Sequence, residues 1–156
     1  MNINWKKFLI CLAIPLATGG LATLLSGGMD RYQVMNQPPL SPPGWIFPVV
    51  WTVLYLLMGY ASYRIAESDV PKEDRRKALI FYGIQLFLNF LWPIVFFRFQ
   101  NIGAAMAELI LLLVLVVLTT VQFIKIDRLA GVLLLPYLLW LSFALYLNIG
   151  LYFLNM

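Results

Sequence analysis

Five long apolar runs decide what this chain can fold into. They cover residues 5–26, 44–66, 77–97, 102–124 and 129–154. Each run is near the ~20 residues with which a helix spans a bilayer, and only helices and closed barrels satisfy their backbone groups inside hydrocarbon. The sequence therefore predicts an all-α integral membrane protein, a bundle of five transmembrane helices that forms a single domain over residues 1–156.

Composition excludes several classes of function. Charged residues make up 12% of the chain, whereas a soluble domain carries about 25%. The net charge of +4 is interpreted as attraction to anionic headgroups of the lipid bilayer, so we expect no nucleic-acid partner. Histidine, the commonest general base and metal ligand, is absent. We therefore expect no metal site and no resident cofactor.

The basic residues are distributed unevenly between the two ends of the predicted bundle. Two of them, Arg31 and Arg98, lie at one end. The other nine lie at the N-terminal end: Lys6, Lys7, Arg64, Lys72, Arg75, Arg76, Lys77, Lys125 and Arg128. Because such residues are retained in the cytoplasm, we expect the N-terminus inside and the C-terminus outside, in a plasma membrane of bacterial type.

The first run also resembles a signal peptide, with Lys6 and Lys7 before an apolar core and small residues at 17–20. Apolar character continues beyond these small residues, which favours an uncleaved span. A proline-rich segment, Pro38 to Trp45, then leads into the second run. Proline fixes φ and keeps the preceding residue extended. The segment is either a stiff lid over a pocket or a simple loop at the membrane surface.

Polar and aromatic side chains recur at helical spacing in three of the runs, so each set shares one helix face. The sets are Pro48, Trp51, Tyr55, Gly59 and Ser62; Tyr82, Gln85, Asn89 and Trp92; and Pro136, Tyr137, Trp140, Ala144 and Asn148. The amides of Gln85 and Asn89 cannot stay unpaired in hydrocarbon. They either join helices to one another or face a mostly apolar ligand pocket. Ala144 leaves a gap between large neighbours that would admit a flat ligand.

Glu108 is the single acid well inside an apolar run. An intramembrane carboxylate is by default a functional candidate. The alternative, which we favour, is a group near the interface that pairs with Arg98 or with a tyrosine. The small residues from Gly103 to Ala107 permit close contact with a neighbouring helix or with a second copy in a homodimer.

The same residues resemble the translocator protein family, also called the tryptophan-rich sensory proteins or peripheral benzodiazepine receptors. The resemblance covers nearly the whole chain. It is carried by Pro-Pro-Gly-Trp at 42–45, Pro-Val-Val-Trp at 48–51, Leu-Asn-Phe-Leu-Trp-Pro at 88–93, Pro-Tyr-Leu-Leu-Trp at 136–140 and Leu-Asn at 147–148.

The resemblance implies a five-helix bundle, often a homodimer, that binds tetrapyrroles such as protoporphyrin IX as well as isoquinoline and benzodiazepine-type ligands. It implies a ligand site between helices near the loop after the first span. The matching positions are Tyr32, Trp51, Asn89, Phe90, Trp92, Trp140, Phe143, Ala144 and Leu147. The favoured function is a tetrapyrrole-binding sensor or transport protein. The alternative is a light-dependent porphyrin-degrading enzyme in which Trp51 and Trp140 act as catalytic residues.

Overall fold

The computed structural model describes residues 2–155, and every regular element in this range is helical. Five spans are long and apolar enough to cross a membrane, which confirms the predicted fold class. They are α1 (Trp5–Ser26), α3 (Ile46–Ala66), α4 (Lys72–Pro93) with the π-helical turn η1 (Ile94–Arg98), α5 (Ile102–Ile126), and α6 (Arg128–Val132) with α7 (Leu135–Asn155). A short helix, α2 (Asp30–Val34), lies between the first two spans.

The third span begins five residues earlier than predicted, at Lys72 rather than at 77. The segment 67–76, which connects the second and third predicted runs, is helical in its second half. Glu73 and Asp74 lie in the first turn after Pro71, where acidic side chains favour the helix dipole. These acidic side chains therefore stabilise the start of the helix.

The fifth span is divided into two helices, where a single helix over 129–154 was predicted. Helix α6 ends at Val132, and α7 starts at Leu135, one residue before Pro136. Proline has no N–H to bond the carbonyl four residues earlier, and its ring clashes with that carbonyl. The carbonyl concerned belongs to Val132, so the division coincides with the end of α6.

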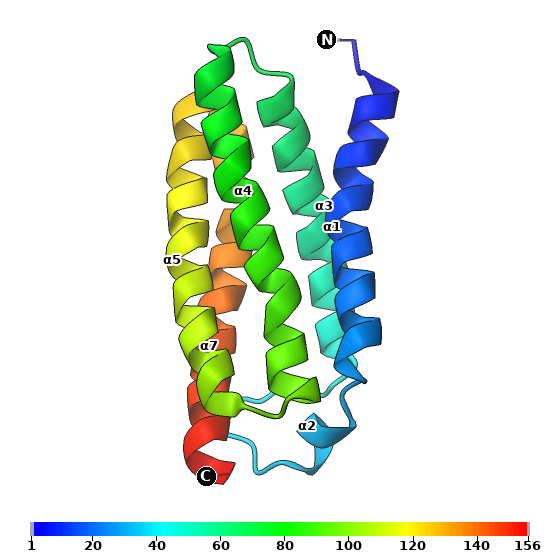
Figure 1. The fold of residues 1–156 in the computed structure, drawn as a ribbon, viewed down its shortest axis with the longest axis vertical. Helices are drawn as coiled ribbons and strands as arrows, with labels where there is room; N and C mark the ends of the chain where they lie inside the picture. Colours follow the sequence, from blue (N-terminus) through cyan, green and yellow to red (C-terminus); the bar gives the residue numbers. More distant parts are fainter. Residues whose placement is uncertain (1, 156) are drawn as a thin grey trace.

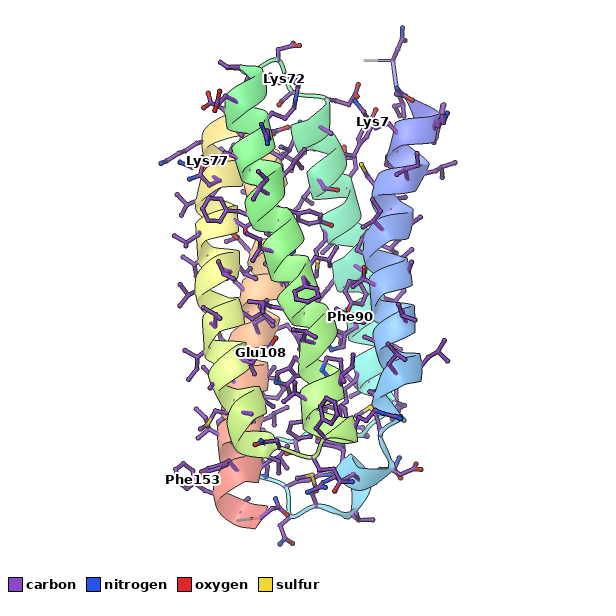
Figure 2. The ribbon with its side chains drawn as sticks, in the orientation of Figure 1. Lys7, Lys72, Lys77, Phe90, Glu108 and Phe153 are labelled. Carbon is purple, nitrogen blue, oxygen red and sulfur yellow. The ribbon has the colours of Figure 1, made fainter. Side chains whose placement is uncertain are left out.

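Figure 1 shows the long helices standing side by side, with the N-terminus at one end of the bundle and the C-terminus at the other. Helix α1 packs against α3 and α4, and α5 packs against α4 and α7. Helix α2 and the proline-rich segment cross the end of the bundle that is opposite the N-terminus (Figure 1). Figure 2 shows Lys7, Lys72 and Lys77 at the N-terminal end and Phe153 near the other.

Two glycines allow α1 and α3 to approach closely. A Cβ atom added to Gly59 would lie 2.7 Å from the carbonyl oxygen of Cys11, and one added to Gly19 would overlap the Tyr55 ring. Small residues at such contacts are common between membrane helices. The outer surface is apolar, since Leu24 and Leu139 are 79% and 74% exposed. This surface suits contact with lipid.

Candidate functional site

An apolar cavity of about 190 Å³ lies between α1, α3 and α4, at the end of the bundle that α2 covers. Its walls are Gly19, Ala22, Thr23, Ser26, Gly28, Met29, Phe47, Pro48, Trp51, Tyr55, Asn89, Trp92 and Pro93. A smaller pocket of about 20 Å³ shares Trp51, Asn89 and Trp92 and extends to Ala144. We call these two spaces the lid-end cavity and its extension.

A chain of buried hydrogen bonds joins α3, α4 and α7 beside the lid-end cavity. Tyr55 Oη donates to Asn89 Oδ1 at 2.8 Å, and Asn89 Nδ2 donates to Tyr137 Oη at 2.7 Å. Tyr137 Oη in turn donates to Gln85 Oε1 at 2.8 Å. Gln85 thus links helices, whereas Asn89 links helices and also lines the cavity.

A second set of hydrogen bonds orients Trp92. Its Nε1 donates to Asn148 Oδ1 at 3.1 Å, and Asn148 Nδ2 donates to the carbonyl of Ile102 at 3.2 Å. The Trp92 ring also stacks on Phe96 at 4.9 Å between ring centroids. One wall of the cavity is therefore held by groups from α5, α7 and η1.

Residues 29–43 cross the end of the bundle at which the lid-end cavity lies, and Met29 lines this cavity (Figure 1). We call residues 29–43 the lid. Tyr32 is buried in α2 and donates its hydroxyl to the carbonyl of Pro42 at 2.9 Å. Burial raises the pKa of the Tyr32 phenol above its ordinary value, so the hydroxyl keeps the proton that it donates. The ring meets Phe47 edge to face at 5.2 Å. No residue from Pro38 to Trp45 is among the lining residues of the cavity, so the lid interpretation of the proline-rich segment stays a prediction.

The lid is fastened to the last turns of α7. Asn36 N donates to Asn155 Oδ1 at 3.0 Å, and Asn155 Nδ2 donates to the carbonyl of Asn36 at 2.9 Å. Tyr146 Oη donates to the carbonyl of Pro39 at 2.6 Å. Gly150 lies so close to Pro38 that an added Cβ would be 2.6 Å from the proline ring. We refer to the Asn36–Asn155 pair as the latch.

Aromatic rings continue from the lid into α7. Phe47 lines the cavity. The centroid of its ring lies 5.8 Å from that of Trp140, and the centroids of Trp140 and Phe143 are 5.5 Å apart. Trp140 Nε1 is buried with no hydrogen-bond partner among residues 2–155. The ring centroid of Trp51 lies 5.5 Å from that of Tyr55 and 6.1 Å from that of Tyr137.

The predicted site residues divide into groups by position. Trp51, Asn89 and Trp92 line the cavity, and Ala144 lines its extension. Tyr32 lies in the lid, Trp140 and Phe143 lie behind Phe47, and Leu147 is buried on α7. The main walls of the cavity come from α1, α3 and α4, whereas α7 borders only the extension.

Phe90 is not brought to the lid-end cavity. It lines an outer groove between α1 and α4 together with Ile14 and Thr18, and its ring stacks on Phe87 at 6.4 Å. One residue along a helix rotates the side chain by about 100°, so the neighbour of Asn89 faces elsewhere. Figure 2 places Phe90 on the α4 side that faces α1.

Glu108 does not have the partner that we expected. Both of its carboxylate oxygens are buried without a hydrogen-bond partner among residues 2–155. Arg98 is exposed in η1, beyond the end of α4, where it lines a shallow cavity with Arg31. The predicted pairing with Arg98 or with a tyrosine is therefore wrong.

Sequence comparison adds independent evidence. The sequence profile of the TspO/MBR family matches residues 8–154. The chain belongs to this family. The match includes the first span, and α1 supplies walls of the lid-end cavity. The protein is therefore an integral membrane protein of the TspO/MBR family with five spans.

Individual relatives agree with this assignment. A tryptophan-rich protein TspO of Archaeoglobus fulgidus is 43% identical over 98% of this chain and 99% of its own length. The tryptophan-rich sensory protein of Cereibacter sphaeroides is 38% identical over 95% of this chain and 90% of its own. The translocator protein of Homo sapiens is 38% identical over 78% of this chain and 72% of its own.

Proposed function

We propose that this TspO/MBR protein is a membrane sensor or transport protein that binds a flat tetrapyrrole such as protoporphyrin IX in the lid-end cavity. The family assignment and the names of the relatives, sensory protein and translocator protein, support this function. The observation that carries the proposal is the cavity itself, in which the Trp51 and Trp92 rings and the Asn89 amide meet beneath a lid. Apolar walls with a few placed polar groups are typical of small-molecule sites.

The size of the cavity adds a requirement to the proposal. At about 190 Å³ it is smaller than the ~300–1,000 Å³ of most ligand pockets. A tetrapyrrole therefore requires the lid to move outward, and the 20 Å³ extension beside Ala144 offers a second direction of widening. Isoquinoline and benzodiazepine-type ligands, being smaller, require less movement. Trp140 Nε1, which has no partner among residues 2–155, lies behind Phe47, so it becomes available to a ligand carbonyl or carboxylate only when Phe47 moves.

Ala144→Phe tests this proposal, because it fills the extension that Trp51, Asn89 and Trp92 share. Protoporphyrin affinity should fall by at least about tenfold, or ~1.4 kcal/mol. Ala107→Phe is the matched control, since Ala107 is exposed on α5. Affinity is measured by tryptophan fluorescence quenching in detergent. Equal affinities for Ala144→Phe and the parent would remove α7 from the site.

A second function, light-dependent porphyrin degradation, is favoured by the surroundings of Trp51. This indole lines the cavity and contacts both Tyr55 and Tyr137, so easily oxidised rings adjoin the proposed ligand. Under light, an excited porphyrin would supply the reactivity, and the protein would orient it. Trp140 is separated from the cavity by Phe47, which makes it the second candidate.

Trp51→Phe separates the two functions, because phenylalanine keeps an aromatic surface and loses the indole. The dissociation constant is measured in the dark, and the loss of porphyrin absorbance is measured under fixed light at saturating protein. If Trp51 takes part in the reaction, the rate falls and the affinity stays near that of the parent. A variant that binds and degrades like the parent would refute the role of Trp51 in oxidation.

We further propose a bacterial plasma membrane location with the N-terminus in the cytoplasm and the C-terminus outside. The nine basic residues at the N-terminal end support this orientation. In a Cys11→Ser background, a cysteine at Asn155 should be labelled from outside and one at Asp74 from inside only. The reverse labelling would contradict the orientation. We also propose that the protein forms a homodimer, which the molecular mass of the detergent-solubilised protein tests.

A further inference from the structure

A second cavity lies at the N-terminal end of the bundle, the end opposite the lid. Its volume is about 440 Å³, and it is bounded by the start of α1, the end of α3 and the junction of α5 with α6. We call it the basal cavity. Its lining combines the aromatic rings of Phe8, Tyr60 and Tyr63 with several charged groups. The volume lies in the ~300–1,000 Å³ range of small-molecule sites.

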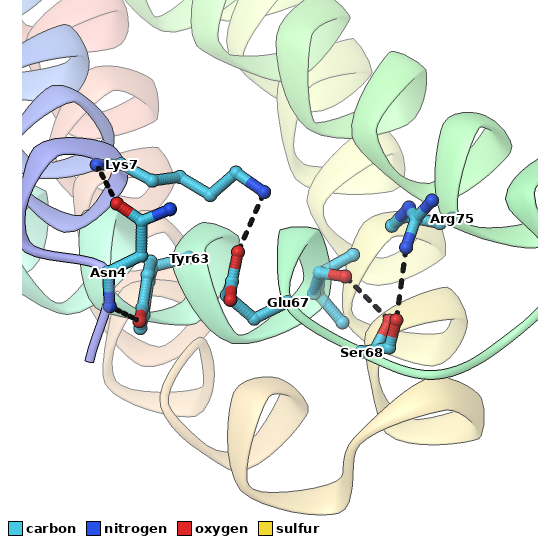
Figure 3. Close-up of polar contacts among 7 residues, drawn as sticks. Asn4, Lys7, Tyr63, Glu67, Ser68 and Arg75 are labelled. Carbon is cyan, nitrogen blue, oxygen red and sulfur yellow. Dashed lines mark hydrogen bonds and ion pairs between the residues drawn. The ribbon is translucent and has the colours of Figure 1, made fainter. Parts of the chain in front are cut away.

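The walls of the basal cavity are held in place by groups outside it (Figure 3). Asn4 N donates to Tyr63 Oη at 3.0 Å, and Lys7 Nζ pairs with Glu67 Oε1 at 2.7 Å. Arg75 Nη1 donates to the carbonyl of Ser68 at 3.1 Å. These contacts join α1, the end of α3 and the start of α4. The cavity is therefore preorganised, which reduces the entropy lost when a ligand binds.

The single basic group in the lining is neutralised internally. Arg64 Nε pairs with Asp127 Oδ2 at 2.8 Å, and Arg64 Nη1 donates to Tyr60 Oη at 3.3 Å. Asp127 Oδ1 accepts from Leu129 N at 3.0 Å. Both partners of the pair are thus engaged, so within residues 2–155 the lining offers no unpaired cationic side chain with which to hold an anion.

The acidic groups are less fully compensated. Asp69 is exposed and forms no ion pair or side-chain hydrogen bond among residues 2–155. Glu67 makes its contact with Lys7 through Oε1 alone. With Arg64 paired to Asp127 and Lys7 paired to Glu67, Asp69 is the uncompensated charge in the lining among residues 2–155, at an end of the bundle that is otherwise rich in Lys and Arg. This local reversal of charge favours a positively charged ligand.

The aromatic rings strengthen the same preference. Phe8 lies edge to face with Tyr63 at 5.3 Å and with Tyr60 at 6.2 Å. The Arg64 guanidinium lies over the Tyr60 ring, with Cζ 5.8 Å from the ring centroid. A cation over an aromatic face within about 6 Å is attracted by the ring quadrupole. The basal cavity already holds one such contact and presents further rings to a ligand.

We propose that the basal cavity binds an amphipathic organic cation, an ammonium group on an apolar body. Asp69 attracts the ammonium group, and the rings of Phe8, Tyr60 and Tyr63 enclose the apolar body. Two sources share this chemistry: a soluble amine, and the ammonium headgroup of phosphatidylethanolamine. The site is separate from the lid-end cavity and does not depend on the function proposed for that cavity.

The test compares two probes that share the fluorophenethyl body and carry either a cationic ammonium or a neutral hydroxyl head group. 4-Fluorophenethylammonium and 4-fluorophenethyl alcohol are titrated against the full-length protein in neutral detergent, and ¹⁹F line broadening reports binding. The amine should bind at least about tenfold more tightly than the alcohol. Equal binding of the two probes would overturn the proposal, because it would show that charge plays no part.

Protein variants locate the site. Asp69→Asn should weaken amine binding by about three- to fivefold, the range of an exposed charge contact. Asp74→Asn is the matched control, because Asp74 is exposed on the same end of the bundle but lies outside the lining. Tyr60→Leu should weaken binding by a similar factor. If Asp69→Asn and Asp74→Asn both bind like the parent, the proposal is wrong.

A final experiment distinguishes a soluble amine from the headgroup of phosphatidylethanolamine as the ligand of the basal cavity. The amine titration is repeated in nanodiscs of phosphatidylcholine with and without phosphatidylethanolamine. If phosphatidylethanolamine weakens amine binding to the parent but not to Asp69→Asn, the lipid headgroup competes for the cavity and is its occupant. Unchanged amine binding in both lipid mixtures assigns it to a soluble amine. Either result supports a cation site.

Discussion

The two ends of the bundle enclose cavities that are held together by different kinds of contact. At the lid end, the closing contacts are neutral hydrogen bonds, such as the latch and the Tyr146 contact with Pro39. At the N-terminal end, two ion pairs, Lys7–Glu67 and Arg64–Asp127, hold the walls. One end encloses an apolar, aromatic space, and the other encloses a charged one.

The difference indicates how each end responds to its surroundings. Neutral hydrogen bonds between amides and carbonyls are insensitive to salt, whereas interactions of exposed charges are screened within about 10 Å at 0.1 M ionic strength. The lid end should therefore respond to packing and to the loss of single hydrogen bonds. The N-terminal end should respond to ionic strength.

The largest effect is expected from Gly19→Leu at the lid end. A Cβ atom at this position overlaps the Tyr55 ring, so the ring must move and Tyr55 Oη must leave Asn89 Oδ1. We expect ligand affinity in the lid-end cavity to fall by at least about tenfold, with a lower unfolding temperature from overpacking. Fluorescence titration and thermal unfolding in detergent measure the two effects.

Gly20→Leu is the matched control for this variant, because nothing lies within 4 Å of a Cβ added there. It should behave like the parent in both measurements. Amine binding in the basal cavity should survive Gly19→Leu. Equal losses of affinity in the two glycine variants would mean that helix propensity, not contact with Tyr55, is responsible.

The next largest effect is expected from Asn155→Ala, which removes the latch. The variant loses both hydrogen bonds with Asn36, each worth about 1 kcal/mol. Hydrogen–deuterium exchange should accelerate across the lid, residues 29–43, and ligand dissociation should become faster. Asn2→Ala, at the other end of the chain, is the control. A lid that exchanges at the parent's rate would show that the Tyr146 and Gly150 contacts suffice to hold it.

A smaller effect is expected from salt, which distinguishes the two ends directly. Raising the ionic strength from about 0.1 M to 1 M shortens the screening length from ~10 Å to ~3 Å. Binding of the ammonium probe in the basal cavity should weaken severalfold, whereas protoporphyrin affinity at the lid end should change little. Titrations of both ligands at low and at high ionic strength measure the two changes in affinity. Similar salt dependence at both ends would contradict the comparison.

The smallest effect is expected from Lys7→Gln. The side chains of Lys7 and Glu67 are 44% and 27% exposed, and exposed pairs contribute about 0.2–1 kcal/mol. Thermal unfolding should shift by no more than a few degrees. Lys6→Gln provides the baseline, since Lys6 forms no ion pair among residues 2–155. A loss well above 1 kcal/mol would show that this end is held more by charge than its exposure indicates.

Much of the fold follows from the sequence because hydrocarbon imposes strong constraints. The five spans were predicted from run length alone, and the shared faces of α3 and α4 from helical spacing. Periodicity identifies which face of a helix is buried but not which neighbour it meets. The hydrogen bond from Trp92 to Asn148 was therefore beyond prediction, although each residue had been placed on a polar face.

The walls contributed by α1 were missed for a different reason. Gly19, Ala22, Thr23 and Ser26 line the cavity, and their i, i+3, i+4, i+7 spacing places them on one helix face. This signal was overlooked because the small residues of the first run were compared with those of a signal peptide. The latch was missed as well, since Asn36 and Asn155 are 119 residues apart in the sequence. The early start of α4 was predictable, because acidic residues directly after Pro71 are typical of a helix N-terminus.

The latch also has a mechanical consequence for work with this protein. The final turn of α7 is coupled to the loop that closes the opposite edge of the cavity, so a load on one displaces the other. A reporter or purification tag fused after Asn155 therefore exerts force on the lid through the hydrogen bonds between Asn155 and Asn36. Affinities measured on such fusions will vary with the length and stiffness of the junction, whereas attachment before Asn4 leaves this coupling untouched.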